Sequence, residues 1–471
     1  MKKVFASLLT LVMVTGLAAC STPTPTGTTT AGTTTAGTTT AVTTAAGTTA
    51  AGTTTAVTTA AGTTTAVTTA AGTSTTDISK TVKIGFIALH DNNSGYDAAH
   101  LEGVNKAAKD LGIDPATQII FKYNIPEDQT AYDTAVDLAE QGAKIIFSNS
   151  YGHQMHMLQA AKEYPEITFV SVTGDMAATS GLKNFKNIFP YTFESRYVSG
   201  VVAGMKLKEL MDGGKVKDAY VGYVGAFPYA EVVSGYTAFL LGIQSIVPEA
   251  HMDVQYTNSW YDPVAEGEAA NALMARGAVI IGQHADSTGA PSAVQAALAA
   301  GKVAYSVGYN VDMRSVAPDG ALTSAQNNWS VLYEATLGKF VKGEEVPVDF
   351  ATGAKDGAVM ISELGAKVAP GTKEKVEAAW AGLKAGTLHV FDTSKFTCKI
   401  DHKKTVDAGK TPTYEIDADG HVTKCFALDS NGDFTNDTGE AIVNGAFAES
   451  VLRSAPYFSL RIDKIVELNN N

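Results

Sequence analysis

Histidines are the first side chains in this sequence whose type and spacing could carry chemistry. His153 and His156 lie three residues apart, with thioethers of two methionines beside them, a pattern open to a soft metal ion. No third ligand follows at a persuasive spacing, and a histidine at a helix start is often structural, so we expect no metal at this pair. His284 stands two residues before Asp286, without an identifiable nucleophile. Since neither Gly-x-Ser-x-Gly nor His-Glu-x-x-His occurs, we expect no catalysis and no cofactor.

The elements that position such side chains alternate between strand-like and helix-like segments. Short apolar runs typical of buried strands occur at 82–89, 119–123, 144–148 and 168–172. Helical patterns lie between them at 96–111, 130–141 and 154–163. This rhythm predicts a parallel, doubly wound α/β sheet.

A second series of the same kind begins at residue 220. Strands are predicted at 220–226, 252–257, 279–283 and 303–307, with helices at 231–246, 263–276 and 291–300. Asp262 and Pro263 are a strong helix start, because Asp caps free amides and Pro suits the first helical position. Two such units suggest two lobes that face each other across a cleft. Ligands of parallel sheets bind beyond the carboxyl ends of the strands, so the segments after each strand are the candidate site.

The first twenty residues are typical of an export signal. Lys2 and Lys3 give a positive start, residues 4–14 are mainly apolar, and Leu-Ala-Ala-Cys at 17–20 forms a small-residue cleavage site. This segment resembles a bacterial lipoprotein signal, in which Cys20 receives lipid and becomes the mature N-terminus. We therefore predict a signal peptide over 1–20 and an exported chain, anchored by lipid to the bacterial cell membrane on its periplasmic or outer face.

Residues 21–77 contain almost only Thr, Ala and Gly. The sequence Thr-Thr-Thr-Ala-Val-Thr-Thr-Ala-Ala-Gly occurs at 38–47, 53–62 and 63–72. Such a stretch has too little apolar area to offset the entropy cost of ordering it, so we predict a disordered tether.

The region 391–471 carries two further groups. Cys398 and Cys425 are the cysteines that remain beside Cys20, and in an exported chain we expect a disulfide between them. Residues 429–440 place oxygen side chains at the ligand positions of a calcium loop, but Phe434 stands where the loop needs glycine. We favour a solvated acidic hairpin over a calcium site.

Composition narrows the function classes. The chain has 471 residues, 45% of them hydrophobic, and its formal net charge is −13. A negative surface repels phosphate backbones, so we expect no nucleic acid as a partner. No internal apolar run reaches the roughly 18 residues that a membrane span needs.

The segments after the strands carry motifs in a recognisable order. They are Ser94-Gly95-Tyr96 with His100, Tyr151-Gly152-His153, residues 194–204, residues 222–228 with Glu231, then 258–266, 283–287, 308–313, Ala317-Pro318 and 322–324 with Trp329. From about residue 82 to 342 the chain resembles the basic membrane protein family (Bmp/PnrA-like), which are lipoprotein solute-binding components of ABC importers.

The resemblance implies a type I periplasmic-binding-protein fold, with two doubly wound lobes, three crossovers, a hinge and a ligand cleft. We expect a two-lobed solute-binding domain over 78–390. Lobe 1 is placed at about 80–195 plus 304–330 and lobe 2 at about 196–303 plus 331–390. A small C-terminal extension follows at 391–471.

The resemblance also implies a ligand site. In the family an aromatic ring from each lobe encloses a base, and Tyr96 and Trp260 stand at the corresponding positions. Stacking is worth about 1–3 kcal/mol per base, although either ring could instead belong to the core at a helix start.

Carboxylates and amides hold the ribose in that family. Asp312 is the first choice and Asp286 the second, because a carboxylate accepts two hydroxyl groups at once. Either could instead cap a following helix. The remaining candidates are Asn93, Asn258, Asn310 and His153. The three asparagines could equally be there as turn residues. Relatives usually have Asp at the position of Asn93.

These features predict a substrate-binding lipoprotein that captures a purine nucleoside or a related aromatic heterocycle. It would deliver that ligand to the permease and ATPase subunits of an ABC importer. Two alternatives stay open: a surface-exposed interaction or adhesion lipoprotein, and a receptor for riboflavin or another small solute on the same fold.

Overall fold

The computed structural model describes residues 77–399, 413–426 and 439–469. The leader with Cys20, the tether up to residue 76 and residues 429–438 of the acidic loop lie outside these described residues. Within them, no helix combines the length and the apolar character that a membrane crossing requires.

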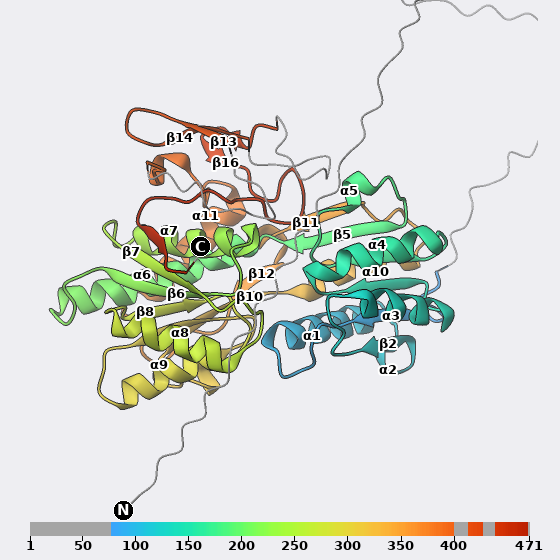
Figure 1. The fold of residues 1–471 in the computed structure, drawn as a ribbon, viewed down its shortest axis with the longest axis horizontal. Helices are drawn as coiled ribbons and strands as arrows, with labels where there is room; N and C mark the ends of the chain where they lie inside the picture. Colours follow the sequence, from blue (N-terminus) through green and yellow to red (C-terminus); the bar gives the residue numbers. More distant parts are fainter. Residues whose placement is uncertain (1–76, 400–412, 427–438, 470–471) are drawn as a thin grey trace, which may run out of the picture. The chain divides into compact units, whose positions relative to one another are not determined.

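The first sheet is parallel and carries the first series of predicted elements (Figure 1). Its strands, in spatial order, are β11 (Asp349–Thr352), β5 (Phe185–Pro190), β4 (Thr168–Ser171), β3 (Ile145–Ser148), β1 (Ile84–Ile87) and β2 (Ile119–Lys122). Its helices are α1 (Gly95–Asp110), α2 (Pro115–Gln118), α3 (Gln129–Glu140), α4 (Gln154–Glu163), α5 (Ala177–Ser180) and α10 (Trp329–Val341).

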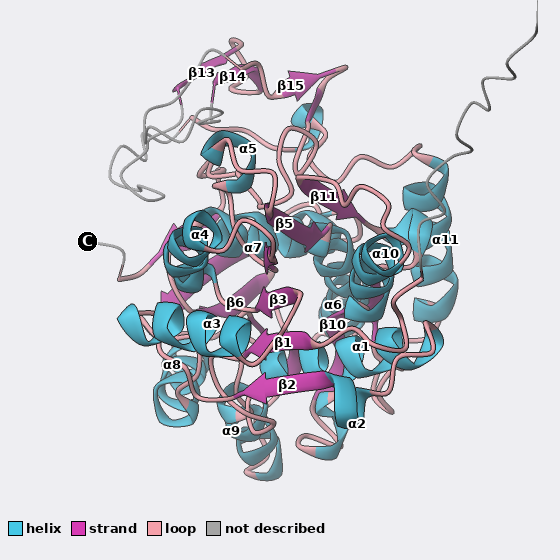
Figure 2. Ribbon diagram, turned by 90° about the vertical axis from the view of Figure 1, so that its right-hand side faces the viewer, coloured by secondary structure: helices cyan, strands magenta, loops and turns pink. Residues whose placement is uncertain are grey.

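Both faces of this first sheet are covered. Phe86 packs in one apolar cluster with Leu332 of α10, and Ile87 packs in another with Leu138 of α3 and Met157 of α4. Figure 2 shows α3 and α4 on one side of the strands and α1 and α10 on the other. Successive residues of a strand point to opposite faces, so a fully apolar run such as Ile84–Ile87 suits a sheet buried on both sides.

The second sheet holds the second series. Its strands, in spatial order, are β12 (Val359–Ile361), β10 (Ala321–Asn327), β9 (Tyr305–Tyr309), β8 (Ile280–Gln283), β6 (Tyr220–Gly225), β7 (His251–Tyr256) and β17 (Ile465–Glu467). Only β12 runs antiparallel to its neighbour among these described strands. Its helices are α6 (Thr192–Asp212), α7 (Ala230–Gln244), α8 (Pro263–Ala275), α9 (Gly289–Ala299) and α11 (Thr372–Ala385).

The second sheet is also covered on both faces. Tyr223 packs in one cluster with Phe239 of α7, while Val224, the next residue, packs in the other with Leu273 of α8. Burying a side chain of this size stabilises the fold by about 1.5–3 kcal/mol. The predicted doubly wound architecture is therefore confirmed for both sheets.

The chain crosses between the two sheets three times, as expected. It leaves the first sheet after β5, returns from β10 to α10, and leaves again between β11 and β12. Where two of these crossovers meet, the Glu194 carboxylate accepts a hydrogen bond of 2.6 Å from the Ala354 amide.

The predicted lobe boundaries are wrong in one part. We placed 304–330 in lobe 1 and 331–390 in lobe 2, whereas β9 and β10 belong to the second sheet. Helix α10 packs in the core of the first sheet, and β11 pairs with β5 there. Periodicity identifies a strand but not the sheet that it joins, because pairing depends on neighbours distant in sequence. Below, lobe 1 denotes 84–190 with 329–352, and lobe 2 denotes 192–327 with 359–385.

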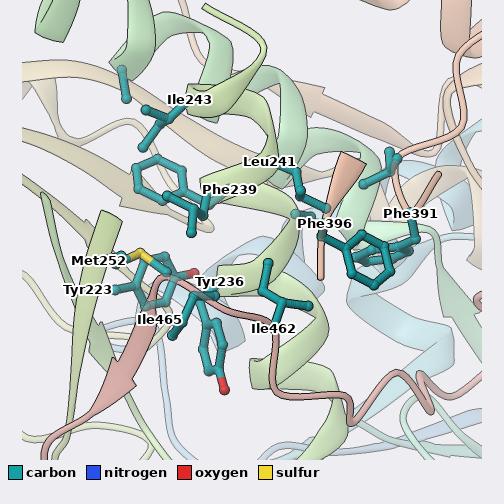
Figure 3. Close-up of a cluster of buried hydrophobic side chains, with 14 of the residues drawn as sticks. Tyr223, Tyr236, Phe239, Leu241, Ile243, Met252, Phe391, Phe396, Ile462 and Ile465 are labelled. Atoms are coloured by element: carbon teal, nitrogen blue, oxygen red, sulfur yellow. The ribbon is translucent and has the colours of Figure 1, made fainter. Parts of the chain in front are cut away.

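The C-terminal extension is part of the core of lobe 2. Its described strands are β13 (Thr413–Ile416), β14 (Val422–Phe426), β15 (Ile442–Val443), β16 (Ala446–Phe447) and β17. β17 adds to the edge of the second sheet beside β7. Figure 3 shows Ile462 and Ile465 in the same apolar cluster as Tyr236, Phe391 and Phe396.

The predicted disulfide is not formed in the structure. Cys398 and Cys425 are both free and buried. Burial raises the pKa of the Cys398 thiol to about 12 and raises the pKa of Cys425 as well.

Candidate ligand-binding site

The two predicted rings line one pocket. Tyr96 and Trp260 face a cavity that holds about 360 Å³ of space between atoms, its opening included. We call it the ring pocket. Its other lining residues are Leu89, Asn149, Ser150, Tyr151, Thr173, Glu231, His284, Asp286 and Tyr309.

Tyr96 is held in place by lobe 1. It lies in the first turn of α1, which Ser94 caps through a hydrogen bond from the Asp97 amide. The Tyr96 hydroxyl donates to the carbonyl oxygen of Asn149 at 2.7 Å. His100 supports the ring edge-on, with 4.3 Å between the ring centroids, and itself stacks on Trp329. These contacts fix the orientation of the phenol ring before any ligand arrives.

Trp260 comes from the loop between β7 and α8 of lobe 2. Its ring lies 5.1 Å from that of Phe227 and 5.9 Å from that of Tyr229, measured between centroids. Asp262 caps α8 by accepting from the amides of Val264 and Ala265, as the sequence predicted. The rings of Tyr96 and Trp260 therefore come from different lobes and from segments next to helix starts.

Asp286 is the buried carboxylate of the ring pocket. Its Oδ1 accepts from the Asn310 amide nitrogen at 2.7 Å, and its backbone amide donates to the carbonyl oxygen of Trp260 at 2.8 Å. Burial, and next the charges of Glu266 and neighbouring acids, raise the pKa of Asp286 well above its ordinary value. Its backbone oxygen also accepts from Gly95 of lobe 1 at 3.2 Å, which joins the lobes at the pocket.

Glu231 and His284 form a second polar group. Nε2 of His284 lies 3.0 Å from Oε1 of Glu231. Burial lowers the pKa of His284, so the imidazole is neutral and can donate to that carboxylate. The side chain of Glu231 keeps 15% of its surface exposed, which leaves it accessible from the pocket. A partly open carboxylate of this kind can accept hydroxyl or ring N–H groups of a ligand.

Glu266 holds the two lobe 2 loops that supply these groups. Its carboxylate accepts from the Ser287 amide at 3.2 Å and from the Asp262 amide at 3.2 Å. Burial raises the pKa of Glu266 to about 7. This one side chain thus ties the loop after β7, which carries Trp260, to the loop after β8, which carries Asp286.

A second pocket adjoins the ring pocket and shares Tyr151, Thr173, Glu231 and Trp260 with it. We call it the Arg453 pocket; it holds about 370 Å³ of space between atoms, its opening included. Its remaining lining residues are Asp175, Tyr229, Ala230, Arg453, Ala455 and Pro456. The last three belong to the C-terminal extension, which no motif in the sequence linked to the site.

Asp312, our first choice for a ligand carboxylate, is not among the residues that line either pocket. It caps a short helical turn through the Arg314 amide, and its carboxylate pairs with the Arg314 guanidinium at 2.6 Å. That guanidinium also contacts Glu363 at 2.9 Å. The hydrogen-bonding capacity of Asp312 is used by a residue two positions on, so the structure favours Asp286.

The four other candidates are not among the residues that line either pocket. Asn93 is exposed and donates a hydrogen bond to the Asp91 carboxylate. Asn258 is exposed in a left-handed turn with φ of 56°. His153 is buried, and its Nε2 lies 2.9 Å from the carbonyl oxygen of Ile125. Asn310 also has a left-handed φ, of 62°, but touches the ring pocket indirectly through Asp286. Turn geometry, the competing explanation, accounts for the first two.

The site contains flat rings and hydrogen-bond acceptors, which suit binding. No group of three or more His, Cys, Asp or Glu side chains able to hold a metal ion occurs in the described parts of the chain. The arrangement brings aromatic rings and hydrogen-bond acceptors of both lobes to one pocket, and these groups suit contact with a planar, polar ligand.

Comparison with known proteins identifies the family of this chain. The pattern of the Bmp family, described as ABC transporter substrate-binding protein PnrA-like, matches residues 81–381. The chain belongs to the Bmp family. Among relatives, a purine-binding protein of Brucella abortus (strain 2308) is 31% identical over 314 residues, which is 66% of this chain and 83% of that protein. A putative ABC transporter glucose-binding protein of Haloferax volcanii is 32% identical over 263 residues, 56% of this chain and 63% of that protein.

Solved structures agree on the fold. An ABC transporter solute-binding protein from Aeropyrum pernix K1 superposes with a TM-score of 0.56 at 17% identity, covering 69% of this chain and 95% of that one. The type I periplasmic-binding fold is thereby confirmed. As a Bmp family member, the chain is the substrate-binding component of an ABC transporter, acts on the periplasmic or extracellular side, and serves permease and ATPase subunits. The Bmp family is a family of substrate-binding proteins, not of enzymes.

Several residues of the ring pocket escaped the sequence reasoning. Asn149 follows β3, Thr173 follows β4 and Tyr309 ends β9, so a strict search beyond every strand end would have found them. Glu231 stood in a Bmp motif but had no assigned role. Arg453 lies beyond the Bmp match, which ends at residue 381, and no sequence signal pointed to it.

Proposed function

We propose that this protein captures a purine nucleoside in the ring pocket and presents it to an ABC permease. The observation that carries the proposal is the placement of Tyr96 and Trp260, one from each lobe, on the same pocket. Two rings hold a flat heterocycle well, and the acids at one edge accept its hydroxyl groups. The purine-binding relative from Brucella abortus supports the same ligand class.

The mechanism is closure of two lobes over the ligand. Contacts such as the Gly95 amide to the Asp286 carbonyl oxygen join lobe 1 to lobe 2 and exist only when the lobes are together. A ligand that touches rings and acids of both lobes binds the closed arrangement more tightly and shifts the population toward it. The permease then recognises the closed form.

A sugar is the second candidate. The Haloferax volcanii relative is named a putative glucose-binding protein, and aromatic rings beside carboxylates also suit pyranose rings. The two ligand classes differ in the contribution of stacking, because only a nucleoside offers two extended π faces.

Calorimetry on the purified protein separates these candidates. Titration with adenosine, guanosine, inosine, riboflavin and glucose is expected to give micromolar or tighter binding for at least one purine nucleoside. Mass spectrometry of the denatured protein should reveal the same compound if it is carried through purification. Binding of glucose alone, with no heat from any nucleoside, would replace the proposal by the sugar receptor.

We also propose lipid attachment at Cys20, which supports a membrane-held receptor. The basic start, the apolar run and the Leu-Ala-Ala-Cys site carry this proposal. Cys20→Ala is expected to move the protein from the membrane fraction to the soluble fraction of the export compartment and to abolish labelling with a clickable palmitate analogue. Equal membrane fractions for variant and wild type would contradict lipid attachment.

A further inference from the structure

The end of the C-terminal extension is firmly built into lobe 2. We call residues 449–467 the C-terminal strap. Ile465 pairs with Met252 of β7 in the second sheet. Arg461 and Glu467 form an ion pair of 3.0 Å with 3% and 9% of their side chains exposed, and the Tyr236 hydroxyl donates to Glu467 at 2.7 Å. The strap therefore moves with lobe 2.

The beginning of the same strap reaches lobe 1. Nη1 of Arg453 lies 3.4 Å from Oδ2 of Asp175, which follows β4. The Ser454 amide donates to Oδ2 of Asp349 at 3.0 Å, and Asp349 begins β11. One short segment thus contacts both lobes, and its contacts with lobe 1 require the two lobes to be together.

The ion pair between Arg453 and Asp175 is shielded. Only 14% of the Arg453 side chain and 19% of the Asp175 side chain are exposed. The Tyr151 hydroxyl donates to the same Oδ2 of Asp175 at 3.0 Å, which keeps the carboxylate oriented toward the strap. Shielded, oriented charge pairs contribute more than exposed ones, for which the typical value is near zero.

The strap also forms a wall of the site. Arg453, Ala455 and Pro456 line the Arg453 pocket, which shares Trp260 and Tyr151 with the ring pocket. A ligand leaving the ring pocket on this side passes the strap.

We propose that the C-terminal strap holds the ligand cleft closed, with Arg453 as the positioning residue that joins it to Asp175 of lobe 1. The ion pair forms only when the lobes are together, so it shifts the population toward the closed form and slows ligand release. The proposal extends the proposed function, because the ligand in question occupies the ring pocket.

The test compares single and double variants with a matched control. Arg453→Met and Asp175→Asn each remove one charge at nearly constant size. Arg276→Met removes another Arg–Asp pair, with Asp253, that lies within lobe 2 and has 53% of the Arg276 side chain exposed. Stopped-flow release of inosine and adenosine measures escape, and hydrogen exchange at the Gly95 amide of the ligand-free protein measures lobe opening.

Release is expected to be roughly tenfold faster in Arg453→Met and in Asp175→Asn, and the double variant should be no faster than either single one. Exchange at Gly95 should rise in the same variants, while Arg276→Met behaves like the wild type. If Arg453→Met releases ligand and exchanges the Gly95 amide at the wild-type rates, the proposed role of the strap is wrong. If the wild type binds neither nucleoside, the proposed function fails, yet Gly95 exchange still decides whether the strap holds the lobes.

Discussion

Trp260→Ala is expected to weaken purine nucleoside binding by about tenfold or more, because stacking against one base is worth roughly 1–3 kcal/mol. Trp260 lines both pockets, and Tyr96 lines the ring pocket together with it. Removing the indole takes away one of the two rings that enclose the base and opens the pocket to water. Titration calorimetry with inosine measures the loss directly.

Two further variants make this result specific. Trp260→Phe keeps a ring and should recover most of the affinity. Tyr123→Ala removes an aromatic ring that is 43% exposed and lines neither pocket, so its affinity should equal that of the wild type. A thermal melt of each variant checks that Trp260→Ala has not unfolded lobe 2 through its contacts with Phe227 and Tyr229. Unchanged inosine affinity in a folded Trp260→Ala protein would remove the ring pair from the binding mechanism.

Glu231→Gln is expected to lower nucleoside affinity by roughly tenfold to a hundredfold, since a hydrogen bond to a charged group is worth about 1.5–3 kcal/mol. Glu231 lines both pockets and keeps part of its carboxylate open beside the neutral His284. The amide has the same shape but is a weaker acceptor, and it carries no charge to attract hydroxyl or N–H groups.

Glu268→Gln is the matched control, because Glu268 is an exposed acid on α8 of the same lobe. It changes the net charge equally without touching a pocket and should leave affinity unchanged. Comparing adenosine with 2′-deoxyadenosine shows which part of the ligand Glu231 contacts. If Glu231 contacts the ribose, Glu231→Gln should weaken the binding of adenosine more than the binding of 2′-deoxyadenosine. Wild-type affinity for every purine nucleoside in Glu231→Gln would show that this carboxylate contacts no ligand.

The strand-end rule located some of the residues that line the ring pocket and also selected residues that do not line it, for a local reason. Tyr96, Trp260 and Asp286 follow strands and line the ring pocket. Asp312 also follows a strand, but its carboxylate turns to Arg314, two residues away. Position along the chain shows where a side chain starts, whereas its direction depends on the partners that compete for it.

The alternation of apolar strand segments and helical patterns by itself determined the α/β class and the two doubly wound lobes, and the ordered motifs after the strands indicated the family. These features are local, because each strand or helix reveals its burial through its own period of hydrophobic residues. The tertiary structure alone decided which sheet β9 and β10 join, which carboxylate faces the pocket, and that the strap completes its wall. These features depend on contacts between residues far apart in the sequence, such as the hydrogen bond between Tyr236 and Glu467, which are 231 positions apart. Local periodicity carries no information about partners so far apart, and only packing of the whole core selects them.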